Sequence, residues 1–216
     1  MKSILLEHFP DLSNVQLDQY KKFAEIFPLW NQRINCISRK DIDNLFINHI
    51  LHSLSIAKVF NFSKETTIAD IGTGGGFPGI PLAIMFPDVN FDLVDSIGKK
   101  TTVVKNISEE LNLNNIKAIN TRAETLDCKY NVIISRAVTS FPEFYKMVKH
   151  ILLNKPEFEP NGIIYLKGGD FQNEISGFSK IQIFNIIDYL KFDYFETKKI
   201  IYLPINKKSE IKVLNK

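Results

Sequence analysis

Apolar residues recur at helical spacing in the first part of the chain. A period of three to four residues predicts an amphipathic helix whose inner positions are Leu17, Tyr20, Ala24 and Phe27. Ser13 or Asn14 is expected to cap its start, because short polar side chains accept hydrogen bonds from the first free amides. Pro28 is expected to end or kink it, because proline lacks the amide hydrogen. A second helix is expected from about residue 41 to residue 59.

After residue 63 short apolar runs alternate with longer segments, a pattern typical of repeated βα units around a parallel sheet. Strands are expected at residues 67–71, 90–95, 116–120, 132–135 and 163–167. Helices are expected between them at residues 80–86, 99–111 and 141–153. Later runs predict antiparallel edge strands at residues 181–187 and 199–203, and the basic end 206–216 is expected to fray or to add a short strand. These patterns divide the chain into a helical extension, residues 1–62, and an α/β domain, residues 63–216.

Composition narrows the class of protein. Hydrophobic residues make up 44% of the chain, enough for a packed core, and the net charge of +3 permits an RNA partner without requiring one. The two cysteines, Cys36 and Cys128, lie far apart without metal-ligand spacing, so neither a metal site nor a disulfide is expected. The sequence shows neither a signal peptide nor an apolar run long enough to cross a membrane. We therefore expect a cytoplasmic protein without a membrane or metal partner.

A glycine-rich loop is the strongest local signal. Five of the eight residues from Gly72 to Gly79 are glycine, and the loop joins a predicted strand to a predicted helix. Such glycines allow a tight turn and let a ligand approach the main chain. The alternative is a purely structural turn, which five glycines make costly because each loses extra backbone entropy on folding. Asp95 ends the next predicted strand, where a carboxylate can accept both hydroxyls of a ribose. The combination predicts an adenosine-containing cofactor.

The loop pattern alone does not name that cofactor. Residues 74–79 also satisfy the dinucleotide pattern G-x-G-x-x-G. Asp70 immediately precedes the loop, and its carboxylate would repel the pyrophosphate of a dinucleotide. S-adenosylmethionine has no phosphate and carries a sulfonium and an ammonium group, so the acidic residue favours this methyl donor.

Further short motifs accompany the loop, namely Trp30-Asn31, Ile34-Asn35, His49-Ile50-Leu51, Leu93-Val94-Asp95, Arg122-Ala123-Glu124, Ser135-Arg136-Ala137-Val138 and Leu166-Lys167-Gly168. In this combination the chain resembles the RsmG (GidB) family of small-subunit ribosomal RNA guanine-N7 methyltransferases, from about Trp30 to Lys167. One departure is His52, where the family more often has Asp.

The resemblance implies a class I S-adenosylmethionine-dependent methyltransferase with a Rossmann-like, seven-stranded, mostly parallel sheet behind a helical extension. It implies that the chain methylates guanine N7 in 16S ribosomal RNA, with the RNA or the small subunit as partner. Together with the glycine-loop reading, it gives as cofactor contacts Gly72, Gly74, Phe77, Asp95, Ala123, Glu124 and Arg136.

The chemistry of this acceptor needs no general base, because guanine N7 offers a lone pair and carries no proton at neutral pH. The Asn/Asp-Pro-Pro-aromatic turn typical of exocyclic-amine methylation is replaced here by residues 135–138. Cytosine C5 methylation needs a nearby cysteine, and Cys128 is expected to be buried or incidental. Arg136 ends a predicted strand and is the one candidate catalytic residue, in a positioning role, with an ordinary surface ion pair as the alternative.

Other candidates remain open. Phosphate contacts are expected from Arg33, Arg39, Lys99, Lys100 and Lys167, each of which has a solvated cation as its alternative. His49 either faces the cleft or packs in a core helix, His52 is expected to be structural, and Trp30 is expected in the core, with stacking on RNA as the alternative. Two other functions also remain: a non-catalytic nucleotide- or RNA-binding module, and a methyltransferase acting on a protein or small molecule.

Overall fold

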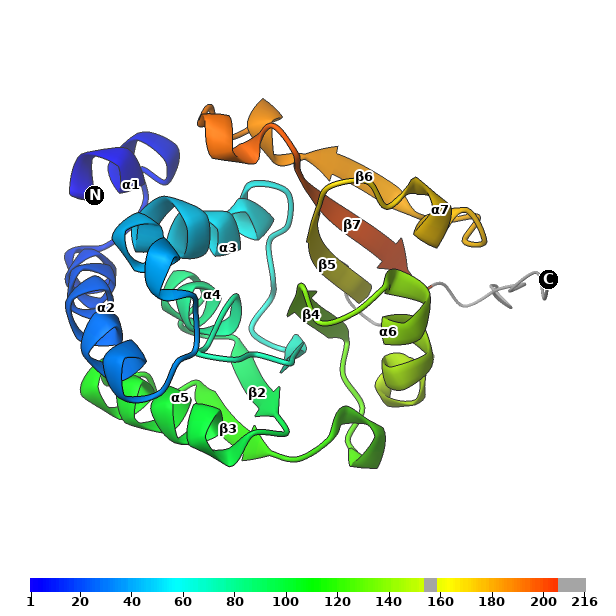
Figure 1. The fold of residues 1–216 in the computed structure, drawn as a ribbon, viewed down its shortest axis with the longest axis horizontal. Coiled ribbons are helices and arrows are strands. Elements are labelled where there is room, and N and C mark those ends of the chain that lie inside the picture. Colours follow the sequence, from blue (N-terminus) through cyan, green and yellow to red (C-terminus); the bar gives the residue numbers. More distant parts are fainter. Residues whose placement is uncertain (154–158, 206–216) are drawn as a thin grey trace.

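A twisted seven-stranded sheet forms the centre of the computed structural model, which describes residues 1–153 and 159–205 (Figure 1). Its strands follow the order β3-β2-β1-β4-β5-β7-β6. Strands β1 to β5 pair in parallel, whereas β7 runs antiparallel to both β5 and β6. The strands are β1 (Thr67–Ile71), β2 (Asn90–Asp95), β3 (Ile116–Asn120), β4 (Val132–Arg136), β5 (Gly162–Gly168), β6 (Gln182–Asn185) and β7 (Lys198–Pro204). The predicted fold class is confirmed, and the expected end segment 206–216 lies outside the described residues.

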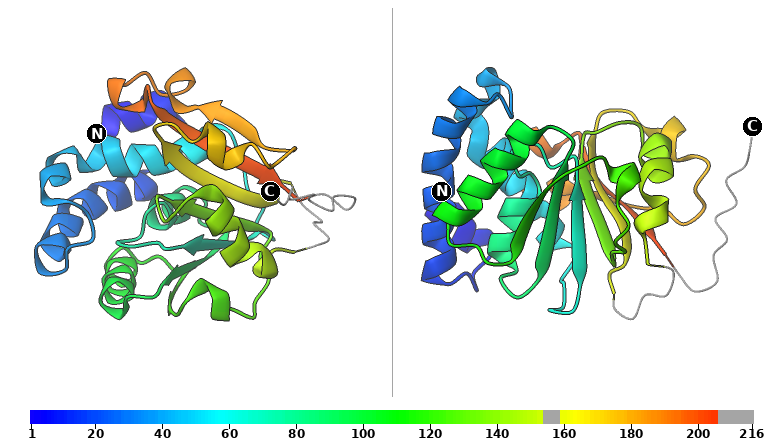
Figure 2. Two further views of the ribbon diagram at one scale, coloured as in Figure 1. Left: turned by 45° about the vertical axis from the view of Figure 1, so that its right-hand side comes forward. Right: turned by 90° about the horizontal axis from the view of Figure 1, so that it is seen from below.

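Helices cover both faces of this sheet (Figure 2). Successive strand residues point to opposite faces, so Ile134 packs on one side and Ile133 on the other, in two separate apolar clusters. The first cluster includes α4 (Gly79–Met85) and α5 (Gly98–Glu110), and the second includes α6 (Phe141–Val148) and α7 (Gln172–Ile175). The predicted helix 141–153 is shorter than expected, since a 3₁₀ turn, Lys149–Ile151, follows α6.

The N-terminal helices pack on the side of the sheet that carries α4 and α5. Helices α1 (Lys2–His8) and α2 (Asn14–Arg33) contribute Leu5, Tyr20 and Phe23 to the first apolar cluster. Side chains from both parts of the chain therefore share one core, and the division at residue 62 stays a prediction.

Pro28 does not end α2, which continues to Arg33, so that alternative of the prediction is wrong. Proline removes one helical hydrogen bond, but tertiary contacts hold the helix on both sides of it. Phe27 is fully buried before the proline, and the buried side chain of Asn31 bonds the following loop through the backbone of Cys36 and Ile37.

The expected uniform helix over residues 41–59 is also wrong in detail. A 3₁₀ turn, Arg39–Asn44, leads into a π-helical turn, Leu45–Leu51, then a single α-turn, α3 (His52–Leu54), and a second 3₁₀ turn, Ser55–Lys58. The hydroxyls of Ser53 and Ser55 bond main-chain carbonyls within this segment, at 2.6 Å each. Such bonds compete with regular helical pairing. A π-turn is rare and often marks a functional site.

Gln16 ties α2 to the sheet-covering helix α4. Its Oε1 accepts from the amide of Ser13, whose Oγ accepts from the amide of Gln16, so the expected cap at Ser13 is a reciprocal capping box. The Nε2 of Gln16 donates to the carbonyls of Ile84 and Met85 at 2.8 and 3.1 Å, which would otherwise be free at the end of α4.

We expect Gln16→Ala to lower the free energy of unfolding by about 1–3 kcal/mol, because several hydrogen bonds worth about 0.5–1.5 kcal/mol each are lost. Urea unfolding measures this change. Lys21→Ala, on the exposed side of α2, is the control and should stay within about 0.5 kcal/mol of the unmodified protein. Equal effects of the two substitutions would contradict the assignment.

Candidate functional site

A cavity of about 460 Å³ opens at the carboxyl ends of β1, β2 and β4. The strand order reverses between β1 and β4, and ligands bind at such switch points in open α/β sheets. The volume falls in the usual range for small-molecule sites. The residues that line it include all seven predicted cofactor contacts, Gly72, Gly74, Phe77, Asp95, Ala123, Glu124 and Arg136.

The glycine loop forms one wall of the cavity. Gly72 and Gly74 have φ angles of +71° and +58°, in the region that disfavours side chains. A Cβ on Gly72 would lie 2.4 Å from Val138, so the loops after β1 and β4 meet closely there. A Cβ on Gly74 would meet nothing within 4 Å, so this glycine leaves its backbone open to a ligand.

Asp70 holds the loop from inside the protein. Its fully buried carboxylate accepts from the Thr73 hydroxyl at 2.6 Å and from the Gly79 amide at 2.8 Å, both through Oδ2. Burial raises the pKa of Asp70 to about 7, and the two hydrogen bonds oppose this shift. Asp70 is not among the cavity-lining residues, so its observed role is to hold the loop beside the cavity.

Asp95 holds the same loop from the neighbouring strand. Its Oδ2 accepts from the Gly74 amide at 2.9 Å, and its Oδ1 accepts from the Ile97 amide at 2.8 Å. The side chain is largely buried but lines the cavity. A carboxylate can accept further hydrogen bonds at each oxygen, so this group retains capacity for a ligand.

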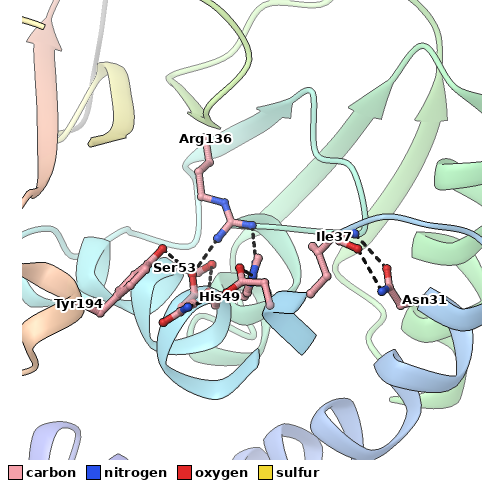
Figure 3. Close-up of polar contacts among 8 residues, drawn as sticks. Asn31, Ile37, His49, Ser53, Arg136 and Tyr194 are labelled. Carbon is pink, nitrogen blue, oxygen red and sulfur yellow. Dashed lines mark hydrogen bonds and ion pairs between the residues drawn. The ribbon is translucent and has the colours of Figure 1, made fainter. Parts of the chain in front are cut away.

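Arg136, the last residue of β4, reaches across the cavity to the N-terminal helices (Figure 3). Its Nη1 donates to the carbonyl of Asn48 at 3.2 Å, and its Nη2 donates to Nδ1 of His49 at 2.8 Å. The guanidinium also lies 5.2 Å from the centre of the Phe77 ring. Burial lowers the pKa of Arg136, although an arginine of this kind stays charged.

His49 is buried in the π-helical turn and does not line the cavity, which favours the packing alternative, although it contacts Arg136. Its Nε2 lies 2.5 Å from Oδ2 of Asp41, and burial lowers the pKa of His49 to about 4. His52 packs against the rings of Tyr194 and Phe195, and burial lowers its pKa well below the ordinary value. Sequence reasoning missed Asp41, for which the only signal was its position eight residues before His49.

The loop before the first 3₁₀ turn forms another wall that the sequence did not predict. Cys36 and Ile37 line the cavity, and Asn31 fixes them. Its Oδ1 accepts from both backbone amides at 2.8 and 2.9 Å, and its Nδ2 donates to the Ile37 carbonyl at 3.1 Å (Figure 3). Cys128 is exposed, contrary to burial, and does not line the cavity.

The predicted phosphate contacts are not gathered in one place. Lys100 lines the cavity, and Lys99 is exposed beside it. Arg39 is exposed at the start of its 3₁₀ turn, and Arg33 lies over the ring of Trp30, which packs against the core. Lys167 forms an ion pair with Glu174 at 2.5 Å, so its charge is already compensated. Their contacts with RNA stay predictions.

Within residues 1–153 and 159–205 no cluster of three or more His, Cys, Asp or Glu side chains could hold a metal ion. In the same part of the chain no helix is long and apolar enough to cross a membrane.

The chain matches the family model described as rRNA small subunit methyltransferase G over residues 16–201. It belongs to this family. The chain is 48% identical over 203 residues to the ribosomal RNA small subunit methyltransferase G of Flavobacterium psychrophilum, which covers 93% of this chain and 97% of that one. With the protein of the same name from Porphyromonas gingivalis, it shares 45% identity over 94% of this chain and 93% of the other.

Solved structures agree on the fold. A SAM-dependent methyltransferase from Aquifex aeolicus superposes with a TM-score of 0.51 at 14% identity, over 79% of this chain and 100% of the other. A ribosomal protein L11 methylase from Lactobacillus delbrueckii subsp. bulgaricus gives 0.52 at 16% identity, over 72% and 77%. Family membership and fold together make the chain a methyltransferase with S-adenosylmethionine as its cofactor, as the sequence predicted.

We expect Asp70→Asn to change how stability depends on pH. Because the folded-state pKa is raised, the stability that Asp70 contributes is present below about pH 4 and is lost as the pH rises through about 7. Relative to the variant, the unmodified protein should therefore lose stability between about pH 4 and 7, by at most about 1.4 kcal/mol per pH unit. Urea unfolding at several pH values measures it, and a constant difference would contradict the buried charge.

We expect Asp95→Ala to weaken binding of S-adenosylhomocysteine about 10-fold to 100-fold in calorimetry, because a charged acceptor for hydrogen bonds is lost from the cavity wall. Asp92→Ala is the matched control on the same strand. It removes the 2.7 Å bond from the Tyr130 hydroxyl and should lower stability while leaving this affinity unchanged. Normal binding by Asp95→Ala would remove Asp95 from the cofactor site.

Proposed function

We propose that this chain methylates N7 of a guanine in small-subunit ribosomal RNA by direct in-line transfer. Family membership supports ribosomal RNA as the substrate class. The observation that carries the choice of atom is the cavity lining, which contains no histidine among the described residues and whose two carboxylates there, Asp95 and Glu124, are assigned here to the cofactor. Such a reaction takes place where ribosomes are assembled, so we place the protein in the cytoplasm.

The cavity fits S-adenosylmethionine by shape and by its polar groups. Asp95 would accept from the ribose hydroxyls, and Glu124, beside Ala123, would accept from the adenine edge. Gly72, Gly74 and Phe77 would give the ligand main-chain and ring surface. When bound, the cofactor supplies a methyl group on a sulfonium, which is already an activated electrophile.

Arg136 is the positioning residue of this proposal. Two of its five N–H groups are held by Asn48 and His49, so the remaining donors are available at the cavity that it lines. A planar guanidinium suits a carboxylate or the O6 and N7 edge of guanine. Its part is to align the reacting groups, since near-attack geometry alone lowers the barrier of a transfer between two bound partners.

In the part of the chain that the structure describes, no imidazole lines the cavity, and its carboxylates, Asp95 and Glu124, have the cofactor as their proposed partner. His49 contacts Arg136 from outside the lining, and its Nδ1 lone pair already accepts from that guanidinium. Burial raises the pKa of the Cys36 thiol, which disfavours the thiolate that methylation at cytosine C5 requires. Guanine N7 needs neither group, because it carries no proton at neutral pH.

The RNA would approach over the cations at the rim of the site. Lys99 and Lys100 stand at the start of α5 beside the cavity, and Arg39 lies on the N-terminal side, beyond the wall formed by residues 36 and 37. Arg33 and Lys167 are the other candidates for phosphate contacts. Lys167 is the weakest of them, because Glu174 already compensates its charge. Phosphate contacts of this kind position the RNA without reading its sequence.

We expect a small-subunit RNA that carries 7-deazaguanine at the target position to bind but to accept no methyl group, because only the nucleophilic nitrogen is removed. Single-turnover transfer of a tritiated methyl group, followed by nucleoside analysis, identifies the target in RNA from a strain that lacks the enzyme and then measures the substituted RNA. Methylation of the 7-deaza substrate would show another acceptor atom, and the substrate assignment would fall while the cofactor assignment survived.

A further inference from the structure

A chain of polar contacts runs from the cofactor cavity into the N-terminal helices. Arg136 donates from Nη2 to Nδ1 of His49 at 2.8 Å, and Nε2 of His49 lies 2.5 Å from Oδ2 of Asp41. The other oxygen of Asp41 accepts from the Asn48 side chain at 2.6 Å. The main-chain carbonyl of Asn48 in turn accepts from Arg136 at 3.2 Å, which closes the network.

The partners of His49 decide where its single proton lies. A guanidinium has only donors, so Nδ1 of His49 must be the acceptor. The proton therefore sits on Nε2 and points at the Asp41 carboxylate. The neutral imidazole thus lies between the Asp41 carboxylate and the Arg136 guanidinium, donating to the first and accepting from the second.

We propose that Asp41 and His49 are positioning residues that fix the guanidinium of Arg136 against the cofactor cavity. The proposal deepens the site described above and rests on Arg136 acting at that cavity, not on guanine N7 as the acceptor. Arg136 enters from β4, whereas its two bonded partners come from the π-helical turn, so the N-terminal segment completes the site.

The surroundings of the relay favour a single arrangement. The His49 ring packs against Phe77, with ring centres 5.2 Å apart, and Phe77 also carries the guanidinium on its face. The Tyr194 hydroxyl donates to the same Asn48 carbonyl at 3.3 Å, which holds the far side. A side chain as long as arginine loses considerable rotamer freedom when fixed, and prior fixing removes that cost from ligand binding.

The charges around His49 keep it an acceptor. Arg136 disfavours a second positive charge on the ring, Asp41 favours one, and burial outweighs the carboxylate, so the pKa of His49 falls to about 4. Burial, together with the charges of Arg136 and Lys198, lowers the pKa of the neighbouring His52. The charge of Asp70 favours the protonated form of Arg136, whose pKa burial lowers. The relay therefore persists throughout the neutral pH range.

A double-mutant cycle tests whether His49 acts through Arg136. Affinity for S-adenosylhomocysteine is measured by calorimetry without RNA, and single-turnover transfer is measured on small subunits from a strain that lacks the enzyme. We expect His49→Ala to lower the cofactor-product affinity, the transfer rate or both by about 10-fold. Arg136→Ala should lower the same quantities by about 10-fold to 100-fold. In the Arg136→Ala background, His49→Ala should cause no further loss, because the residue that it positions is gone.

Conservative variants separate positioning from folding. His49→Gln keeps one acceptor and one donor and should restore most of the loss seen in His49→Ala, whereas Asp41→Ala should behave as His49→Ala does. Asp43→Ala, an exposed carboxylate of the same 3₁₀ turn, is the control and should leave cofactor affinity unchanged. Thermal unfolding shows whether each variant folds. If His49→Ala does not fold, Asp41→Asn, at a partly exposed position, replaces it in the cycle.

Additive losses in the cycle, or an Arg136→Ala variant with normal affinity and normal transfer, would overturn the proposal. A failure of the guanine-N7 assignment would leave the cycle on cofactor affinity unchanged, because that measurement contains no RNA. The two proposals therefore fail separately.

Discussion

The partly buried positive charge of Arg136 is the constraint on which the site depends. A guanidinium removed from water is costly unless its donors are paired, so the protein must bring acceptors to it. Those acceptors, His49 and the Asn48 carbonyl, come from the N-terminal helices and not from the sheet. The irregular path of residues 39–58 follows from this requirement, since a π-helical turn brings both acceptors to the end of β4. The helical extension is thus part of the cavity wall as well as a cover for the core.

Two carboxylates perform the corresponding task for the glycine loop. Asp70 holds it from within through Thr73 and Gly79, and Asp95 holds it from the next strand through Gly74. Glycines cost backbone entropy when they are ordered, and these bonds offset part of that cost. The loop is therefore fixed in shape while the backbone at Gly74 remains open towards the cavity. This loop, between β1 and α4, thus presents main-chain groups to the cavity.

The fold by itself does not choose the acceptor of the methyl group. Solved methyltransferases of similar architecture share less than a fifth of their sequence with this chain, and those likenesses concern the sheet and its helices. The site of this chain combines a held arginine, an imidazole with both nitrogens engaged, and a thiol whose pKa is raised by burial. In the proposed reaction the nucleophile brings its own lone pair, so the transfer would depend on alignment of the reacting groups and not on proton transfer.

The sequence by itself determined the βα order, the strand positions, and the glycine loop and strand ends that line the cavity. Short apolar runs, the glycines and the acidic strand ends are local signals, and parallel strands bring their carboxyl ends to one edge of the sheet. Only the tertiary structure decided that α2 passes through Pro28, that Asp70 turns inward, and that Asp41 and His49 hold Arg136. These outcomes depend on contacts between segments far apart in the chain, such as His49 and Arg136, whose positions differ by 87. Local periodicity carries no information about such contacts, because burial and pairing override intrinsic preference only once the segments meet.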